Sequence, residues 1–436
     1  MTNPAQLSAS ILRGDLRRTA LALALVCALT AVAMPSAQAQ TYNVIHSFNL
    51  AAGDGAGPDA GLILDSHGNL FGTTFAGGTS GACNGFTCGT VFEMSPANGG
   101  GWTETVIHNL GSIDGHPGAP LTMDSHGNLY GTAGGFSGEG AVFELLPGSG
   151  GSWTEVVLHQ FRGNGDGSGP GSAVTLDSSG ILYGTTSSGG EYNEGTVYSV
   201  NPHLISGESV VHSFVPSVTS GNAPSSTYLQ IINGNIYGTT IYGGPSGGPY
   251  GGGTVFQLTP SGSGWTATTL YAFKGASQGD GSRPIAGLLF DGTNNFYGVT
   301  QTGGTASGNC QQDGCGTVYK LTHNSDGSWS ESVLYSFQGQ TDGNGPWGNL
   351  IFDRSGNIYG TTYAGGVQNG YGNGTVFKLT PGTGGHWTET VIARLPGGAG
   401  GSIVPGGVVM DSAGNLYGTA QNGGAYGYGV VCEITP

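Results

Sequence analysis

The sequence predicts an all-β protein: a single seven-bladed β-propeller of four-stranded antiparallel blades, closed by its N-terminal strand. A variant of Gly-Asn-Leu-Tyr-Gly-Thr-Thr occurs seven times, every 53–62 residues. Such a period, with short strand-like runs between glycine-rich turns, is typical of propellers rather than helical solenoids. The last repeat also lacks a fourth strand, and an unpaired strand of that type stands near residue 42.

Each repeat divides into four expected strands, which in the first repeat are residues 60–65, 69–74, 89–94 and 102–107. Asp65 and Gly68 stand at the first and fourth places of the turn between the first two strands, as a type I turn prefers. A glycine-rich loop of variable length joins the second strand to the third. The fourth strand begins at a tryptophan in five repeats.

The two ends of the repeat array are complementary. The last repeat stops after a third strand at 429–434, and the segment 42–48 reads as a fourth strand without a blade. An open array would leave a bare strand edge, which invites aggregation. We therefore expect residues 40–436 to form one domain, with the first strand completing the last blade.

Residues 1–39 read as a secretory signal peptide. Arg13, Arg17 and Arg18 precede an apolar run over 20–34, and Ala37-Gln38-Ala39 follows as an Ala-x-Ala cleavage site. The run is short for a membrane-spanning helix. We expect cleavage near Ala39, a secreted or periplasmic location and no membrane insertion.

The composition excludes several partners. Glycine supplies 88 of 436 residues, and the formal net charge is −16. An acidic surface of this kind repels nucleic acid and anionic membranes but accepts neutral ligands and cations. We expect a monomer that binds no nucleic acid.

The cysteines indicate an oxidising compartment. Cys83 and Cys88, and Cys310 and Cys315, share the spacing C-x4-C at the same place in two repeats. In an exported protein this spacing predicts two local disulfides. Cys432 aligns with Phe92, so we expect a buried thiol.

The blocks G-N-L-Y-G-T-T, G-G and G-T-V-F-E-L resemble the GloVer repeat (Gloeobacter/Verrucomicrobia type) of secreted bacterial proteins with various surface anchors. The resemblance covers residues 41–436. It implies a repeat architecture but no particular activity. Because no C-terminal anchor segment is present in the sequence, we expect a released or periplasmic protein.

Residues that recur in most repeats are attributed to the blade itself. The turn aspartates, such as Asp65, are expected to bond local backbone. The glutamates of the fourth strand, such as Glu104, are also assigned to the blade. One position in the fourth strand is interpreted as packing: His46, His108, His159 and His212.

The loops between second and third strands vary most, and they share one face with the links between blades. We expect binding on that face. Trp347 would stack on a sugar ring there, although packing between neighbouring links is the favoured explanation. The other candidate binding residues are Tyr192, Tyr242, Tyr250, Tyr371 and Tyr426.

Two sets of carboxylates are candidates for chemistry. Glu139 and Glu194 precede the third strand in adjacent blades and would serve a glycoside hydrolase or lyase, since glycoside hydrolysis needs two carboxyl groups. The links carry Asp-Gly pairs that would ring the channel mouth and attract calcium, although turn chemistry also explains them. These weak metal candidates are Asp54, Asp114, Asp166, Asp280 and Asp342. No other cofactor is expected.

The function that this pattern favours is a non-enzymatic exported scaffold that binds an extracellular glycan or protein through its variable face. Two alternatives remain: a polysaccharide-acting enzyme using Glu139 and Glu194, and a structural envelope or matrix protein.

Overall fold

The structure is a computed structural model. It describes residues 40–50, 53–79, 87–111, 115–134, 140–163, 165–204, 207–216, 221–224, 228–244, 251–305, 310, 313–367, 372–402 and 406–435. Residues 41–435 form one compact unit, and the predicted signal peptide lies outside the described residues. Among the described residues, no helix is long and apolar enough to cross a membrane.

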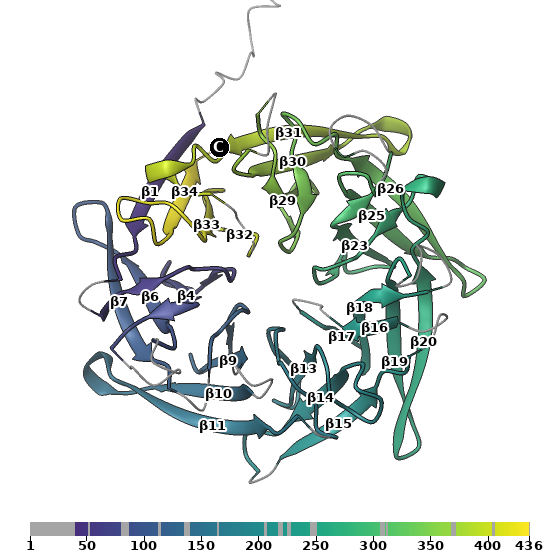
Figure 1. Ribbon diagram of the computed structural model, residues 1–436, viewed down its shortest axis with the longest axis horizontal. Coiled ribbons are helices and arrows are strands. Elements are labelled where there is room, and N and C mark those ends of the chain that lie inside the picture. Colours follow the sequence, from purple (N-terminus) through teal and green to yellow (C-terminus); the bar gives the residue numbers. More distant parts are fainter. Residues whose placement is uncertain are drawn as a thin grey trace, which may run out of the picture. The chain divides into compact units, whose positions relative to one another are not determined.

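The prediction of a seven-bladed propeller is confirmed. Seven sheets, each with four antiparallel strands as its core, stand around a ring, and the fourth strand of each blade lies at the periphery (Figure 1). Two blades carry a fifth strand from the preceding link, and two more links form short two-stranded ribbons. Because neighbouring repeats pack on one another, the repeat period of the sequence becomes the blade period of the ring.

The first three blades consist of β3 (Ile63–Leu64), β4 (Leu70–Thr74), β6 (Thr90–Pro96) and β7 (Trp102–Asn109); β8 (Thr122–Met123), β9 (Leu129–Gly134), β10 (Gly140–Pro147) and β11 (Trp153–Phe161); and β12 (Thr175–Leu176), β13 (Leu182–Thr186), β14 (Thr196–Val200) and β15 (Glu208–Ser213). The next three consist of β17 (Gln230–Ile232), β18 (Asn235–Gly243), β19 (Thr254–Ser261) and β20 (Gly264–Ala272); β22 (Leu289–Phe290), β23 (Asn295–Thr300), β25 (Thr317–His323) and β26 (Trp329–Ser336); and β28 (Ile351–Phe352), β29 (Ile358–Ala364), β30 (Thr375–Pro381) and β31 (Trp387–Arg394).

The link strands are β2 (Gly55–Ala56) with β5 (Ala76–Gly77), β16 (Gly221–Pro224), β21 (Gly281–Ser282) with β24 (Thr302–Gly303), and β27 (Asn344–Pro346). Each link strand pairs with the end of the second strand of the blade that it enters, or with the residues just after it. The links are thereby held on the face that also carries the second–third loops.

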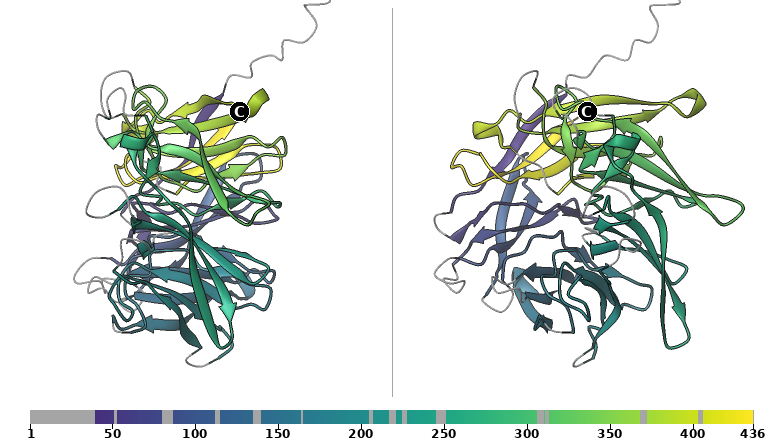
Figure 2. Two further views of the ribbon diagram at one scale, coloured as in Figure 1. Left: turned by 90° about the vertical axis from the view of Figure 1, so that its right-hand side faces the viewer. Right: turned by 45° about the vertical axis from the view of Figure 1, so that its right-hand side comes forward.

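The seventh blade is closed by the first strand, as predicted. It consists of β32 (Val408–Met410), β33 (Leu416–Ala420), β34 (Val430–Thr435) and β1 (Thr41–Ser47), with Thr41 opposite Thr435. In Figure 1 and both views of Figure 2, the purple strand lies beside the yellow strands of the chain's other end. A bulge puts His46 opposite Val431, the same register that puts His108 opposite Val91 in the first blade. The closing strand is therefore an ordinary fourth strand.

The innermost strands are shorter than predicted. Residues 60–65 were expected to form a strand, but only Ile63–Leu64 do, because the preceding backbone contacts neighbouring blades at the centre of the ring. A Cβ on Gly61 would collide with the carbonyl oxygen of Gly406. Asn349 forms a bridge with Gly407, which belongs to the next repeat. Glycine is needed at these places because two backbones approach closely.

The second threonine of the Gly-Thr-Thr block makes the same buried contact in several blades. The hydroxyl of Thr74 lies 2.8 Å from that of Thr90 on the neighbouring strand, and it donates to the carbonyl of Ala76. The same hydroxyl pair recurs in four further blades, in Thr186–Thr196, Thr240–Thr254, Thr300–Thr317 and Thr362–Thr375. These buried polar groups are thus satisfied across the second and third strands, as buried hydroxyls require.

The tryptophans of the fourth strands join adjacent blades. Trp102 meets Tyr417 of the seventh blade at 5.4 Å, and Trp153 meets Phe71 of the first blade at 6.2 Å, both edge to face. Such aromatic pairs contribute beyond the area that they bury. The turn aspartates act as predicted: Asp65 Oδ1 accepts hydrogen bonds from the amides of His67 and Asn69.

Candidate functional site

Exposed aromatic side chains gather on one face of the ring. Among the described residues, the Phe, Tyr and Trp side chains with more than a third of their surface exposed all lie at the end of a second strand or in the loop between it and the third strand. They are Phe75 (44%), Tyr192 (47%), Tyr363 (43%), Tyr426 (58%) and Tyr428 (41%). Together with Trp347 we call them the aromatic rim. The distribution matters because no Phe, Tyr or Trp side chain elsewhere in the described chain is exposed to this extent.

Trp347 and Tyr363 form an aromatic pair within the rim. Their ring centroids lie 5.7 Å apart with the planes tilted by 37°. The Trp347 amide donates to the carbonyl of Thr361, so the link is anchored to β29. Trp347 is half-buried and Tyr363 is exposed. Of the two interpretations of Trp347, its contact with Tyr363 supports packing, while the exposed neighbour leaves a ring surface available to a ligand.

A second aromatic platform joins the first two blades. Phe75 is exposed and stacks on the buried ring of His116, with centroids 4.4 Å apart and planes 15° from parallel. The His116 backbone pairs with Gly134, so the imidazole is held by a link of the second blade. A flat hydrophobic ring supported from below is the usual form of a sugar-stacking surface.

The remaining predicted binding residues lie apart from one another. Tyr242 is half-buried, and its ring faces the Arg283 guanidinium at 5.8 Å. Tyr192 and Tyr426 are exposed, on the third and seventh blades. Tyr250 and Tyr371 lie outside the described residues. The described members of the predicted set therefore lie on different blades instead of forming one pocket.

Of the two candidate catalytic glutamates, one is described. Glu194 Oε2 accepts a hydrogen bond of 2.8 Å from the Asn222 amide group, and its carbonyl accepts one from the amide of Ala223. Glu139 lies outside the described residues. The pairing of the two carboxylates remains a prediction. The contacts of Glu194 hold it against the link that leads to the fourth blade.

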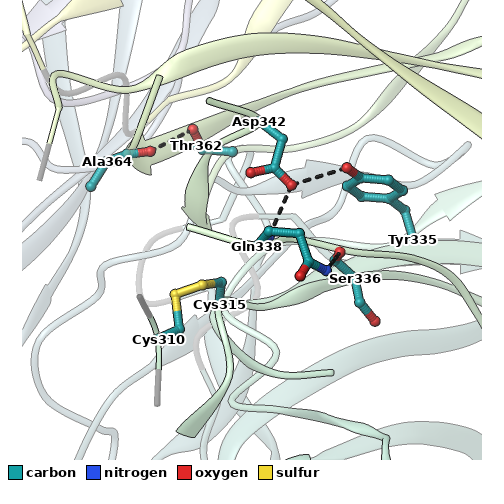
Figure 3. Close-up of a disulfide and its surroundings, with 8 residues drawn as sticks. All are labelled: Cys310, Cys315, Tyr335, Ser336, Gln338, Asp342, Thr362 and Ala364. Atoms are coloured by element: carbon teal, nitrogen blue, oxygen red, sulfur yellow. Dashed lines mark hydrogen bonds between the residues drawn. A yellow bond between two sulfur atoms is a disulfide. The ribbon is translucent and has the colours of Figure 1, made fainter. Parts of the chain in front are cut away.

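The link aspartates contact the outer strands. Asp342 Oδ2 accepts hydrogen bonds from the Tyr335 hydroxyl at 3.0 Å and from the Gln338 amide at 2.8 Å (Figure 3). Asp280 accepts from the Tyr271 hydroxyl and from the Lys274 amide, each at 2.8 Å. These contacts hold the two carboxylates at the periphery, beside the fourth strands, instead of around a channel mouth.

At four other junctions between blades histidine takes the place of tyrosine, and in the sixth blade Ala393 stands at this position. His46 Nε2 lies 3.4 Å from Asp54, and His159 Nε2 lies 3.3 Å from Asp166. His108 lies 3.2 Å from Glu155 of the next blade, while Asp114 lies outside the described residues. Sequence reasoning assigned these histidines to packing alone. It missed the carboxylates, because their partners come from a link and from a neighbouring blade.

The disulfide prediction is confirmed for one pair. Cys310 and Cys315 are bonded, next to the link that carries Asp342 (Figure 3). Cys88 is also disulfide-bonded, and its predicted partner, Cys83, lies outside the described residues. Cys432 is a buried free thiol, as expected. A disulfide in the fold indicates an oxidising compartment.

A hollow on the opposite face was not foreseen. It lies between the fourth and fifth blades, beside the turns of the first–second and third–fourth strands, with a volume of 720 Å³. Tyr237, Phe296 and Trp329 line it together with Asn233 and Asn294. Trp329 stacks on Phe296 at 5.6 Å, so its ring already has a packing partner. The repeat pattern hid this hollow because Tyr237, Phe296 and Trp329 occupy positions that recur in other blades.

The fold and the loop face define a class: a tandem-repeat seven-bladed β-propeller whose variable loops share one face. The model of the Gloeobacter/Verrucomicrobia repeat matches residues 30–248 and 245–436. The chain belongs to this repeat family. No curated protein matches the sequence.

Several solved structures share the fold. A fungal alcohol oxidase of the AA5 family, in complex with copper, aligns with a TM-score of 0.55 and 16% identity, covering 91% of this chain and 76% of the oxidase. An ancestral GH74 enzyme aligns with a TM-score of 0.53 and 13% identity, covering 91% of this chain. This chain spans 51% of the GH74 enzyme's length. At these identities the likeness shows the fold alone.

Proposed function

We propose that this propeller binds a neutral extracellular polysaccharide through the aromatic rim. The observation that carries the proposal is the confinement of exposed Phe and Tyr rings, among the described residues, to the second–third loop face. Rings of this kind stack on the apolar faces of sugars, while the acidic surface disfavours anionic ligands. A rigid ring that presents variable loops is a common scaffold for recognition.

The location that we propose is outside the cytoplasm. The Cys310–Cys315 disulfide supports an extracellular or periplasmic compartment. The predicted signal peptide over residues 1–39 supports the same conclusion from the sequence.

Binding is tested by affinity electrophoresis and calorimetry with soluble neutral polysaccharides such as xyloglucan, galactomannan and mixed-linkage β-glucan. Removing both rings in the variant Trp347→Ala/Tyr363→Ala should weaken binding by about ten-fold, since each stacked ring contributes about 0.5–1.5 kcal/mol. The matched control is Leu204→Ala, which removes a side chain that is 60% exposed in a third–fourth turn on the opposite face. Equal affinity in both variants would refute the rim as the binding surface.

The enzyme alternative is separated by measuring reducing ends and unsaturated products during the same incubations. A binding scaffold releases neither. If products form and Glu194→Gln abolishes their formation while binding persists, the protein acts on its polysaccharide. If the unaltered chain binds no polysaccharide but binds a protein, and the Trp347→Ala/Tyr363→Ala variant no longer binds that protein, the rim recognises protein instead.

A further inference from the structure

Three metal-ligating side chains converge where the closing strand meets the first blade. His46 lies on β1, Asp54 lies in the link that follows, and Glu104 lies on β7. One ligand atom from each lies within 4.8 Å of the other two. In the described part of the chain, this is the one group of three or more such residues that comes this close.

The spacing of the first two ligands fits a metal ion. His46 Nε2 and Asp54 Oδ2 are 3.4 Å apart. Two ligands bound tetrahedrally to zinc at about 2.0–2.2 Å stand about 3.4 Å from each other. Both side chains are mostly buried, with 20% and 17% of their surfaces exposed.

Two of the three ligand groups have a buried atom with no hydrogen-bond partner. His46 Nε2 and Glu104 Oε1 are both shielded from solvent and make no hydrogen bond. Leaving such groups unsatisfied is unfavourable, so an unseen occupant is expected. Asp54 is already oriented, because its two oxygens accept from the amides of Gly55 at 2.6 Å and Asn49 at 2.8 Å. Hydrogen bonds of this kind hold a carboxylate in place for a metal.

Comparison with the other junctions supports an ion here. Where tyrosine stands at the histidine position, its hydroxyl donates to the link aspartate, as Tyr271 does to Asp280 and Tyr335 does to Asp342. At both of these junctions the tyrosine hydroxyl gives the link aspartate a hydrogen-bond partner, although Glu331 Oε1, Glu389 Oε1 and Asp342 Oδ1 have none. At the described histidine junctions with a carboxylate, the Nε2 atoms of His46, His108 and His159 have no hydrogen-bond partner.

We propose that His46, Asp54 and Glu104 bind one Zn²⁺ ion, which joins the closing strand to the first blade. One imidazole nitrogen and two carboxylate oxygens suit zinc better than calcium, which prefers oxygen ligands alone. Water would complete the four-coordinate shell. Because the ligands come from the seventh blade, the link and the first blade, the ion would hold the strand that closes the ring against the blade that follows it.

The alternative occupant is a proton. Burial raises the pKa of Glu104 to about 7, and the neighbouring Asp54 carboxylate adds to the rise, while His46 opposes it. A neutral Glu104 carboxyl group would donate a hydrogen bond within the cluster and leave no place for an ion. Metal binding at pH 7.5 therefore distinguishes the two occupants.

The test uses the purified chain, freed of metal with a chelator, then incubated with ZnCl₂ and passed through a desalting column. We expect one equivalent of zinc per chain by mass spectrometry of metals. At a free zinc concentration 100-fold above Kd, the melting temperature should rise by about 3 °C. Calcium should bind at least about ten-fold more weakly, because it disfavours imidazole.

His46→Ala and Glu104→Gln should each lose the bound zinc and the thermal shift. Glu104→Gln keeps the shape of the side chain, so it serves if His46→Ala does not fold. His212→Ala is the matched control: it removes the aligned histidine from a junction where the link over 215–224 has no acidic residue and Ala267 replaces the glutamate. Its zinc binding should equal that of the unaltered chain. Absence of bound zinc, or zinc retained by both variants through surface histidines such as His67, would overturn the proposal.

Discussion

The protein should lose stability as the pH rises from about 5 to about 8, and Glu331 is the clearest cause. Burial raises the pKa of Glu331 from 4.5 to about 8, and the Asp280 carboxylate adds to the rise, while Lys274 and the Tyr271 hydroxyl oppose it. The folded state therefore holds a proton that the unfolded state has already released above pH 4.5. The stabilisation is complete below pH 4.5 and is lost as the pH rises through about 8.

The size of the effect follows from the two pKa values. The full difference between 4.5 and about 8 corresponds to about 4.8 kcal/mol, at about 1.4 kcal/mol for each pH unit. Because Glu331 is only half-buried, solvent screens its charge, and we expect about 1–2 kcal/mol. In a folded unit of this size, 1 kcal/mol moves the melting temperature by about 1 °C.

The perturbation is Glu331→Gln, and the assay is differential scanning calorimetry at pH 5 and pH 8. At pH 8 the variant should melt about 1–2 °C above the unaltered chain, because the buried negative charge is gone. At pH 5 the two should melt within error of each other. Glu191→Gln removes an equal charge from an exposed side chain and controls for net charge. A variant that melts lower at pH 8, or a gain of equal size at both pH values, would refute the reasoning.

Two further predictions concern the blades. Gly72→Ala should lower the free energy of unfolding by about 1–3 kcal/mol, because the added Cβ would lie 2.6 Å from the buried Phe92 ring. The control is Gly118→Ala, whose added Cβ would have no atom within 4 Å, so its stability should hardly change. Thermal melts of the two variants and the unaltered chain make the comparison. Reducing the Cys310–Cys315 bond should lower the free energy of unfolding by at most about 2 kcal/mol, because the bond closes a loop of only five residues of sequence separation. The β-sheet signal in circular dichroism should stay unchanged. Loss of that signal would show that the disulfide stabilises more than its own loop.

The repeat pattern predicted the architecture because many of the contacts that form a blade lie within a single repeat. Gly-Thr-Thr pairs with Gly-Thr-Val through hydroxyls such as Thr74 and Thr90, and Asp65 caps its own turn. These contacts are local, so sequence spacing reveals them. Closure was also predictable, since the strand at 41–47 fits a missing position in the last blade.

Contacts between blades were less accessible to sequence reasoning. The approach of Gly61 to the Gly406 backbone shortens the innermost strands, and it depends on the radius of the ring. The contacts of His46 with Asp54 and of His108 with Glu155 depend on which strands meet at a junction. The exposure of Phe75 and Tyr363 could have been foreseen, because both directly follow the second strand's last threonine. The partner of Glu194 could not, since Asn222 lies 28 residues away in a link.

The pairing of β1 with β34 sets the order of events during biosynthesis. The first strand of the propeller, Thr41–Ser47, has no strand partner until the last strand, Val430–Thr435, has been synthesised. Until then the apolar side chains of Ile45 and Phe48 lack Val431 of the last strand, which belongs to the same core cluster. Nascent polypeptide shorter than about 430 residues is therefore vulnerable to aggregation and proteolysis, and its protection would fall to chaperones until translation ends.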